Sequence, residues 1–273
     1  MFDRSIKTET IPERVFELCK MISKGDIKDS VARERMEPKG INTSNTSYYP
    51  SIREVLVDPK DLGLVEKDKD EVLRFIGDKK ILKNLETFRI YCNSVAFKNA
   101  DSYFYRITQC FLESDEKWLK YKTLTDSVLR SEIRDATGIP LVDEKMMLGS
   151  RFWISFLGFG YIQEGYAMYF LPNMYIALQD YCELSELEKN KEYTVKEFLE
   201  IISKYAAVAL SRAEEKRAFN LAMSTALREM HDNKEIIIKN YLDSKERWSL
   251  YKDDSHEFTE QFTHITYKGV KRR

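Results

Sequence analysis

The chain has 273 residues, which is room for about two or three domains, and 43% of them are hydrophobic, enough to build cores. Lysine plus arginine number 44 and aspartate plus glutamate 45, so the formal net charge is −1. This balance excludes a chain whose whole surface is basic, the kind that binds nucleic acid or acidic membranes non-specifically. Any DNA contact must therefore come from a local group of cations.

The four cysteines are far apart in the sequence and form no CxxC pair, which predicts buried free thiols in a reducing cytoplasm and no zinc knuckle. The first residues lack the apolar core of a signal peptide. No stretch approaches the roughly 20 apolar residues that a membrane span needs. We therefore expect a cytoplasmic protein that makes no membrane contact.

The first 78 residues predict three helices followed by a β-hairpin. Apolar residues recur at helical spacing in the first helix, and Pro12 suits its first turn. The expected helices are 11–22, 27–36 and 48–57, and the expected strands are 62–65 and 72–76 around a charged turn. This order is that of a winged helix, a helix-turn-helix with a β-hairpin attached.

The same order returns between residues 79 and 187, which we expect to form a second domain. Long helices at 79–98 and 103–119 connect it to the first. The pattern is clearest at 127–171, where two helices precede Gly158 and two strands flank a turn at Glu164-Gly165. The expected elements are helices 127–137, 143–157 and 174–187 and strands 159–163 and 166–171, followed by a charged linker at 185–192.

A third unit is expected within residues 188–273. Thr194 and Glu197 form a capping box ahead of a helical stripe that runs to about residue 210, and a second helix is expected at 219–230. Strands are expected at 236–242 and 247–252 around Asp243-Ser244, with a weaker alternation at 258–267. Either a third winged helix or a mixed α/β cap fits. The predicted fold class is mainly α with short β-hairpins: tandem winged helix-turn-helix units joined by helices.

A helix-turn-helix presents its last helix to the major groove, because the first two helices bury the inner face of the third. In the second unit that helix, 143–157, balances two cations against two anions, and its Trp153 and Phe156 fit either a core or a protein partner. The third unit carries the most DNA-like set of side chains. The candidates for a partner or DNA surface are Tyr49, Arg53, Lys145, Arg151, Lys216, Arg217, Arg228, Lys245 and Arg247.

Motifs of catalysis are missing from the sequence. There is no HExxH metal site, no GxxxxGK[ST] phosphate loop and no GxSxG nucleophile elbow. His256 and His264 lie beside Glu257 and Glu260, but a solvated segment explains this group better than a metal site. We therefore expect no enzyme activity, no cofactor and no bound metal.

The segment 151–161, RFWISFLGFGY, resembles the Trp-x-x-Phe-Leu-Gly-Phe-Gly segment of small accessory proteins in prokaryotic anti-phage defence operons, of which DpdG-like proteins are one group. Residues 11–15 and 62–66 also fit the winged-helix layout of that family. A comparable role belongs to the third subunit of Lamassu-type systems, which works with a structural-maintenance-of-chromosomes (SMC) ATPase and an effector nuclease. The resemblance covers about residues 8–185 and brings no catalytic residues.

The resemblance implies a non-catalytic adaptor that docks on an SMC-type ATPase or an effector nuclease, with double-stranded DNA as a further contact. The main alternative is a winged-helix transcription regulator, which needs a basic recognition helix and a dimerising element. The first is weak here, and no heptad run supplies the second. An enzyme of an unrecognised class is a third hypothesis, and it needs a polar pocket that the sequence does not reveal.

Overall fold

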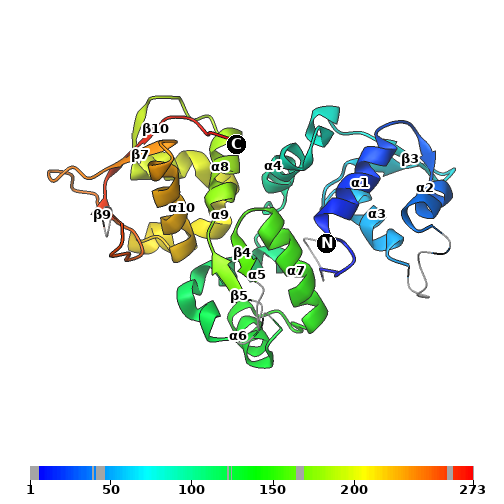
Figure 1. Ribbon diagram of the computed structural model, residues 1–273, viewed down its shortest axis with the longest axis horizontal. Coiled ribbons are helices and arrows are strands. Elements are labelled where there is room, and N and C mark those ends of the chain that lie inside the picture. The colour runs from blue at the N-terminus through cyan, green and yellow to red at the C-terminus, as the bar shows by residue number, and fades with distance from the viewer. Residues whose placement is uncertain are drawn as a thin grey trace.

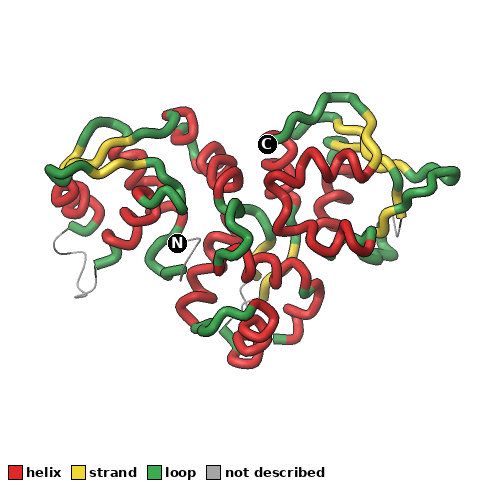
Figure 2. Tube along the Cα trace, turned by 180° about the vertical axis from the view of Figure 1, so that it is seen from behind, coloured by secondary structure: helices red, strands yellow, loops and turns green. Residues whose placement is uncertain are grey.

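A computed structural model describes residues 6–38, 40, 47–121, 123, 125–163, 169–256 and 261–272. Over these residues the protein is mainly helical, with small antiparallel sheets. Figures 1 and 2 show three groups of elements, with the first and third side by side above the second. We call them the N-terminal unit (6–78), the middle unit (103–172) and the C-terminal unit (175–272). Helix α4 lies between the N-terminal and C-terminal units (Figure 1).

The N-terminal unit contains three helices and a three-stranded sheet. Its sheet has the order β1-β3-β2, with Ile27 opposite Leu73 and Val65 opposite Phe75. The predicted helices are present, except that residues 27–28 pair with β3 as a strand before the second helix begins. A hairpin is also present, but its first strand is 65–67 where the sequence predicted 62–65. The elements are α1 (Pro12–Ile22), β1 (Ile27–Lys28), α2 (Asp29–Met36), α3 (Tyr49–Val57), β2 (Val65–Lys67) and β3 (Val72–Phe75).

The two long connecting helices predicted from the sequence are each interrupted. A 3-10 helix, η1 (Lys79–Leu82), precedes α4 (Leu85–Val95), because the Asn84 side chain accepts from the Thr87 backbone N–H and starts a new helix. Helix α5 (Tyr103–Glu113) likewise ends before η2 (Asp115–Lys120), where Asp115 has a left-handed φ of 50°. The prediction of continuous helices over 79–98 and 103–119 is therefore wrong.

The middle unit continues with two helices and a hairpin, as the sequence predicted. Asp143 caps the second helix, since its side chain accepts from the Met146 backbone N–H at 2.7 Å. The hairpin places Tyr161 opposite Leu171, and the predicted turn at 164–165 lies outside the described residues. The elements are α6 (Ser127–Thr137), α7 (Glu144–Phe156), β4 (Gly160–Gln163) and β5 (Tyr169–Pro172).

The C-terminal unit has a sheet of order β6-β10-β7. The predicted hairpin between 236–242 and 247–252 is wrong: β7 pairs with β10, placing Ile236 opposite Tyr267, and β8 pairs with β9. Strand β10 is the central strand and pairs with β6 along one edge and with β7 along the other. Its Ile265 is fully buried. The elements are α8 (Tyr175–Leu184), β6 (Glu192–Thr194), α9 (Val195–Lys216), α10 (Leu221–Asp232), β7 (Ile236–Lys239), β8 (Trp248–Ser249), β9 (Gln261–Phe262) and β10 (His264–Tyr267).

One topology occurs twice in the chain. The N-terminal unit runs helix, strand, helix, helix, strand, strand, and its first strand pairs with its last. Helix α8 and the elements from β6 to β10 repeat that order and that pairing, with β8 and β9 inserted before the last strand. The residues predicted as a linker, 185–192, lead directly from α8 into β6, and Leu187 within them packs against the core.

The apolar core is continuous across the three units. The ring of Phe88 on α4 lies 5.4 Å from that of Phe16 on α1 and 6.2 Å from that of Phe156 on α7. Further along, Phe97 lies 5.2 Å from Phe159. The relative placement of the units is thus set by buried aromatic contacts.

Candidate interaction surfaces

Tyr49 and Arg53 on α3 are tied to a carboxylate on α2. The Tyr49 hydroxyl donates to Asp29 Oδ1 at 2.6 Å, and Arg53 Nη1 lies 2.6 Å from Asp29 Oδ2. Burial alone would raise the pKa of Asp29, but hydrogen bonds from Tyr49 and Arg53 and the charge of Lys67 outweigh it and lower that pKa from 3.8. Tyr49 is buried, so its predicted place on an interaction surface is wrong.

The outer face of α3 is partly covered by the segment ahead of α1. Lys7 Nζ lies 3.2 Å from Ser51 Oγ and 3.8 Å from a carboxylate oxygen of Glu54. The exposed residues of α3 are Pro50 and Glu54. This helix therefore offers no cationic side chain that is free to reach a DNA base.

Helix α7 is covered by the same segment. Trp153 is fully buried, and its indole N–H donates to the Thr10 carbonyl oxygen at 2.6 Å. Only Glu144 and Lys145, in the first turn, are exposed on this helix. The half-buried Arg151 has its guanidinium 4.6 Å from the centre of the Phe152 ring. Of the two cations predicted for this surface, Lys145 is exposed in the first turn of the helix, and Arg151 packs against Phe152.

Helix α10 lies inside the molecule. It packs against α8, β7 and α5, and Asp232 is its one exposed residue. Arg228 Nη2 donates to the Tyr251 carbonyl oxygen at 2.8 Å, and burial lowers the pKa of this guanidinium. Arg228 is 4% exposed, so its predicted place on a DNA surface is wrong. Helices α3, α7 and α10, which precede β2, β4 and β7, thus each have only one or two exposed residues.

The structure brings four of the predicted residues together: Lys216 and Arg217 at the end of α9, and Lys245 and Arg247 in the loop between β7 and β8. The Ser249 backbone N–H donates to the Arg217 carbonyl at 2.8 Å, which joins the two segments. The loop projects from the body, away from the other two units (Figures 1 and 2).

The charge of this loop is mixed. Glu246 pairs with Arg217 at 3.4 Å, Arg247 Nη2 donates to the Leu242 carbonyl at 2.8 Å, and Asp243 is exposed beside them. Lys216 and Lys245 are also exposed. The group is therefore the most cationic surface among the predicted residues, but carboxylates in the same loop offset much of its charge.

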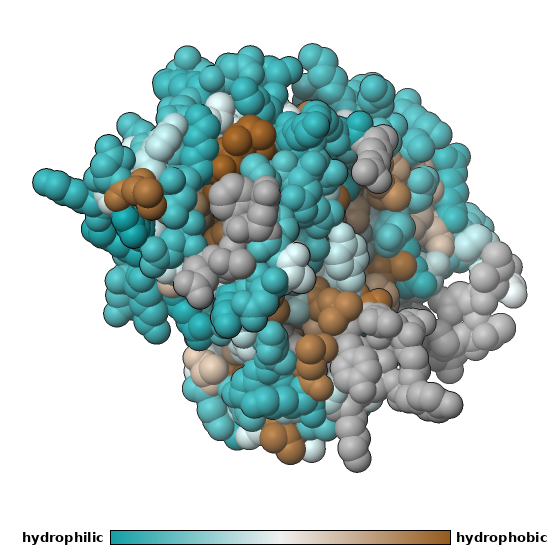
Figure 3. Space-filling model, turned by 60° about the vertical axis from the view of Figure 1, so that its left-hand side comes forward, coloured by the Kyte–Doolittle hydropathy of each residue, from teal (hydrophilic) through white to brown (hydrophobic). Residues whose placement is uncertain are grey.

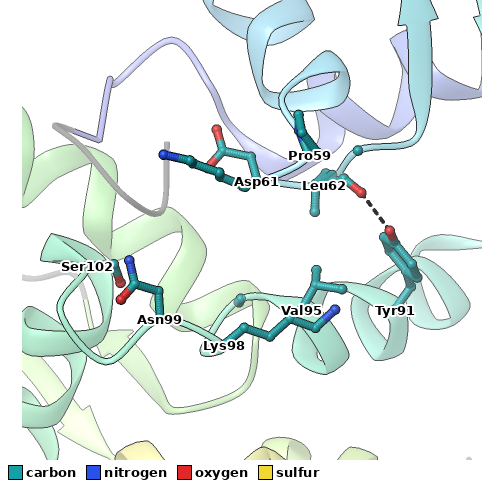
Figure 4. Close-up of a pocket in the computed structure, with 11 residues that line it drawn as sticks. Pro59, Asp61, Leu62, Tyr91, Val95, Lys98, Asn99 and Ser102 are labelled. Atoms are coloured by element: carbon teal, nitrogen blue, oxygen red, sulfur yellow. Dashed lines mark hydrogen bonds between the residues drawn. The ribbon is translucent and has the colours of Figure 1, made fainter.

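A hollow of about 470 Å³ lies between the loop after α3 and the end of α4. Figure 4 shows Asp61 and Lys98 on opposite walls, and the Tyr91 hydroxyl donates to the Leu62 carbonyl at 2.6 Å. The lining residues come from two separate segments, so no spacing in the sequence pointed to them: Pro59, Lys60, Asp61, Leu62, Gly63, Tyr91, Val95, Ala96, Lys98, Asn99 and Ser102. Within the described residues, no three His, Cys, Asp or Glu side chains are placed to hold a metal ion.

The motif at 151–161 contributes to the contact between the middle and C-terminal units, together with the packing of α5 against α9 and α10. Gly158 has a φ of +84°, and a Cβ there would lie 2.6 Å from the Cβ of Ile176 on α8. Phe159 is fully buried, 5.2 Å from the ring of Phe97 and 6.3 Å from that of Tyr181. The glycine lets α8 approach, and the aromatic residue after it fills the space between the units.

Asp180 on α8 is the centre of a buried polar cluster that sequence analysis missed. Arg89 contacts its two oxygens at 2.9 and 3.1 Å, Asn93 Nδ2 donates at 2.7 Å, and Arg272 Nη2 donates at 2.8 Å. The carboxylate has no exposed surface. Its partners lie about ninety residues away on either side, and no local pattern links such distant positions.

None of the helices in the described ranges is both long and apolar enough to cross a bilayer. The chain matches no protein-family model, no curated protein and no solved structure.

Proposed function

We propose that the protein is a non-catalytic, cytoplasmic adaptor subunit of a bacterial antiviral defence complex. It is built from winged helix-turn-helix units and docks on an SMC-type ATPase or an effector nuclease. The observation that carries the proposal is that α3, α7 and α10, the helices that would read DNA, are used for packing within the chain. The link to defence systems rests on the resemblance of residues 151–161.

The repeated topology supports the winged-helix assignment. In the N-terminal unit, α2 and α3 are followed by the hairpin β2–β3, and in the C-terminal unit α9 and α10 are followed by β7 and β10. The middle unit has α5, α6 and α7 and then the hairpin β4–β5. Three helices and a hairpin in that order are the parts of a winged helix.

The burial of these helices argues for protein partners. Direct readout of DNA needs polar side chains that project from a helix into the major groove. Across α3, α7 and α10 the exposed residues are Pro50, Glu54, Glu144, Lys145 and Asp232, which carry three negative charges and one positive charge. Phosphates repel such a set, so these helices are poorly suited to duplex DNA.

Exposed apolar side chains in the middle unit offer a docking surface for a protein. Nine large hydrophobic residues of the described chain are exposed, and four of them belong to this unit. On the face in Figure 3, hydrophobic residues reach the surface at several places, among them the lower end of the molecule, over the middle unit. Exposed large apolar side chains are candidates for contact with a protein partner. The four residues are Leu119, Val128, Leu141 and Tyr161.

The test is co-purification of the chain with the products of the genes on either side of its own, for which we expect an SMC-type ATPase and an effector nuclease. We expect a stable complex in gel filtration, and we expect the double variant Val128→Asp/Leu141→Asp to lose it. Leu242→Asp is the matched control, because Leu242 is also exposed but lies in the C-terminal loop. If the purified chain and both neighbouring proteins elute separately, the adaptor proposal fails.

A DNA-binding regulator is the second candidate, favoured by the gathering of Lys216, Arg217, Lys245 and Arg247. Gel shifts over a range of salt concentrations separate the two functions, because phosphate contacts weaken steeply with salt. An adaptor should bind DNA weakly, without sequence preference, and lose it at moderate salt. Tight binding to one sequence, abolished by Lys245→Glu/Arg247→Glu but not by Lys145→Glu, would establish the regulator instead.

A further inference from the structure

The hollow between the loop after α3 and the end of α4 has the size of a small-molecule site. Its volume of about 470 Å³ falls within the roughly 300–1,000 Å³ that is usual for such sites. It lies where the N-terminal unit meets the link from α4 to α5, and boundaries between units often hold ligands. Figure 4 shows the two walls, with Pro59, Asp61 and Leu62 facing Val95 and Lys98.

Both walls of the hollow are held in place by the chain itself. Gly63 has a φ of +57°, which the tight turn after α3 requires. On the opposite wall the Ser102 backbone N–H donates to the Asn99 carbonyl at 3.1 Å. The bond from the Tyr91 hydroxyl to the Leu62 carbonyl joins the two walls at one end (Figure 4). A ligand would therefore meet a pre-organised site, which lowers the entropy cost of binding.

Hydrogen-bond acceptors on these walls are already engaged. The Asn99 side-chain oxygen accepts from the Asp101 backbone N–H at 3.0 Å, and the Leu62 carbonyl accepts from Tyr91. Asp61 is 3% exposed and interacts with other groups of the chain. A ligand that brought hydrogen-bond donors would have to compete with these existing interactions.

Hydrogen-bond donors, in contrast, remain available. Lys60 and Lys98 are exposed, and neither forms an ion pair in the part of the chain that the structure describes. Ser102 is 2% exposed, and its side-chain oxygen accepts from the Tyr105 backbone N–H at 3.1 Å, while no described residue accepts from its own O–H. The lining carries two positive charges and the single negative charge of Asp61. Two ammonium groups and a hydroxyl favour a ligand rich in acceptor oxygens, which is an anion.

The remainder of the lining is largely apolar. Leu62 and Ala96 are each 3% exposed, and Pro59 and Val95 continue the same surface. An inorganic anion would leave these side chains in contact with water. A ligand with an apolar body would cover them, and the covered apolar area would stabilise the complex.

We propose that this hollow binds a small organic anion, either a phosphate ester or a carboxylate. Its acceptor oxygens contact the ammonium groups of Lys60 and Lys98 and the Ser102 hydroxyl. Its apolar body lies against Leu62 and Val95. The site adds to the adaptor function and does not rest on it, and a ligand bound there joins the N-terminal unit to the link between α4 and α5.

The first test is titration of the full chain with four small molecules, followed by the backbone amide resonances of Gly63 and Ser102 in NMR spectra. Phenyl phosphate and benzoate should give shifts that saturate, and the tighter of the two identifies the anionic group. Phenol, which lacks the charge, and inorganic phosphate, which lacks the ring, should each bind on the order of tenfold more weakly or worse. Equal affinity for phenol and phenyl phosphate would overturn the anion assignment, and the absence of a saturable shift with either organic anion would overturn the site.

The second test removes the two ammonium groups. Lys60→Ala/Lys98→Ala should weaken phenyl phosphate binding on the order of tenfold or more, and it should fold because both side chains are exposed. Lys79→Ala/Lys83→Ala is the matched control, since these lysines are also exposed but lie ahead of α4, at its other end. The control should bind as the wild type does. An equal loss in the two double variants would indicate general attraction of anions and would contradict a site in the hollow.

The third test fills the hollow and keeps both lysines. Val95→Phe enlarges a side chain of the apolar wall, so it should abolish phenyl phosphate binding in a chain whose circular dichroism is unchanged. Unchanged binding by that folded variant would place the anion outside the hollow and refute the proposal. If Val95→Phe does not fold, the comparison of the two lysine pairs still decides. Failure here leaves the adaptor proposal standing, because co-purification tests that function separately.

Discussion

Asp180 and Arg89 form a two-pronged ion pair that joins α8 to α4, with both guanidinium contacts within 3.1 Å and no exposed surface on the carboxylate. Helix α4 leads out of the N-terminal unit, and α8 begins the C-terminal unit. The pair therefore adds a polar contact to the aromatic contacts that place the two units relative to each other.

Asp180→Ala should lower the free energy of unfolding by about 3–5 kcal/mol, because it removes the buried carboxylate that the largely enclosed Arg89, together with Asn93 and Arg272, contacts. Urea denaturation followed by circular dichroism measures the loss. Lys191→Ala is the control: it breaks a pair with Glu188 that is exposed to solvent, and should leave stability unchanged. Equal effects of the two substitutions would mean that the Asp180 cluster does not stabilise the fold.

Gly158→Ala should lower the free energy of unfolding by about 2–4 kcal/mol. The left-handed φ at this position is strained for a residue with a side chain, and the added Cβ would clash with Ile176. Gly25→Ala is the matched change, because a Cβ at Gly25 meets nothing within 4 Å. It should alter stability by less than about 1 kcal/mol. Thermal unfolding of the two variants decides the matter, and similar midpoints would contradict the close approach of α8.

Acid should weaken the N-terminal unit through Asp29 and Glu37. Burial raises the pKa of Glu37, but hydrogen bonds from Ser47 and from the backbone of Tyr49 and Tyr48 outweigh it and lower that pKa from 4.5; the pKa of Asp29 is lowered from 3.8. The pKa of each carboxyl is thus lower in the folded protein than in the unfolded chain. The stability that the two ionised carboxylates contribute is therefore fully present above pH 4.5, and it is lost as the pH falls through their folded-state pKa values.

Urea unfolding measured between about pH 6 and about pH 3 tests whether stability falls as the pH falls, with Asp29→Asn as the comparison. The wild-type chain should lose stability as the pH falls below the unfolded-state values, and the variant should lose less over the same range. A variant whose pH dependence matches the wild type would show that Asp29 carries none of the effect.

Arg228→Ala should cost about 1–3 kcal/mol of stability, because it strands the Tyr251 carbonyl that the buried guanidinium satisfies. Lys245→Ala, at an exposed position of the same unit, should have no measurable effect on stability. In a gel shift at low salt, the folded Arg228→Ala chain should bind DNA as the wild type does. Weaker DNA binding by that variant would place Arg228 on the surface after all.

Local patterns predicted most helices and the strand pairs β2–β3 and β4–β5, because these elements are encoded by neighbouring residues. The helices predicted at 127–137 and 143–157 appear as α6 and α7, and the strand predicted at 159–163 appears as β4. The strand predicted at 166–171 overlaps β5 at residues 169–171, and its first three residues lie outside the described ranges. The break ahead of α4 was missed because Asn84 and Thr87 form a capping box without the usual acidic residue. The pairing of β7 with β10 was missed because the two strands are separated by β8 and β9.

The surface was harder to predict than the elements. Periodicity places Trp153 and Arg228 on particular faces of their helices, but it cannot say which distant segment covers each face. The Thr10 carbonyl accepts a hydrogen bond from Trp153, and the Tyr251 carbonyl accepts one from Arg228. The same limit hid the Asp180 cluster, whose members come from α4, α8 and the residues after β10.

The contacts of Phe88 with Phe16 and Phe156 have a consequence for how the gene can be altered. A fragment that ended at residue 78 would leave the side chain of Phe16 facing water, and one that began at residue 103 would lack the ring that Phe156 packs against. The chain should therefore melt in one cooperative transition and yield no stable fragment on truncation. Swapping a whole unit between related proteins would require transplanting α4 with it.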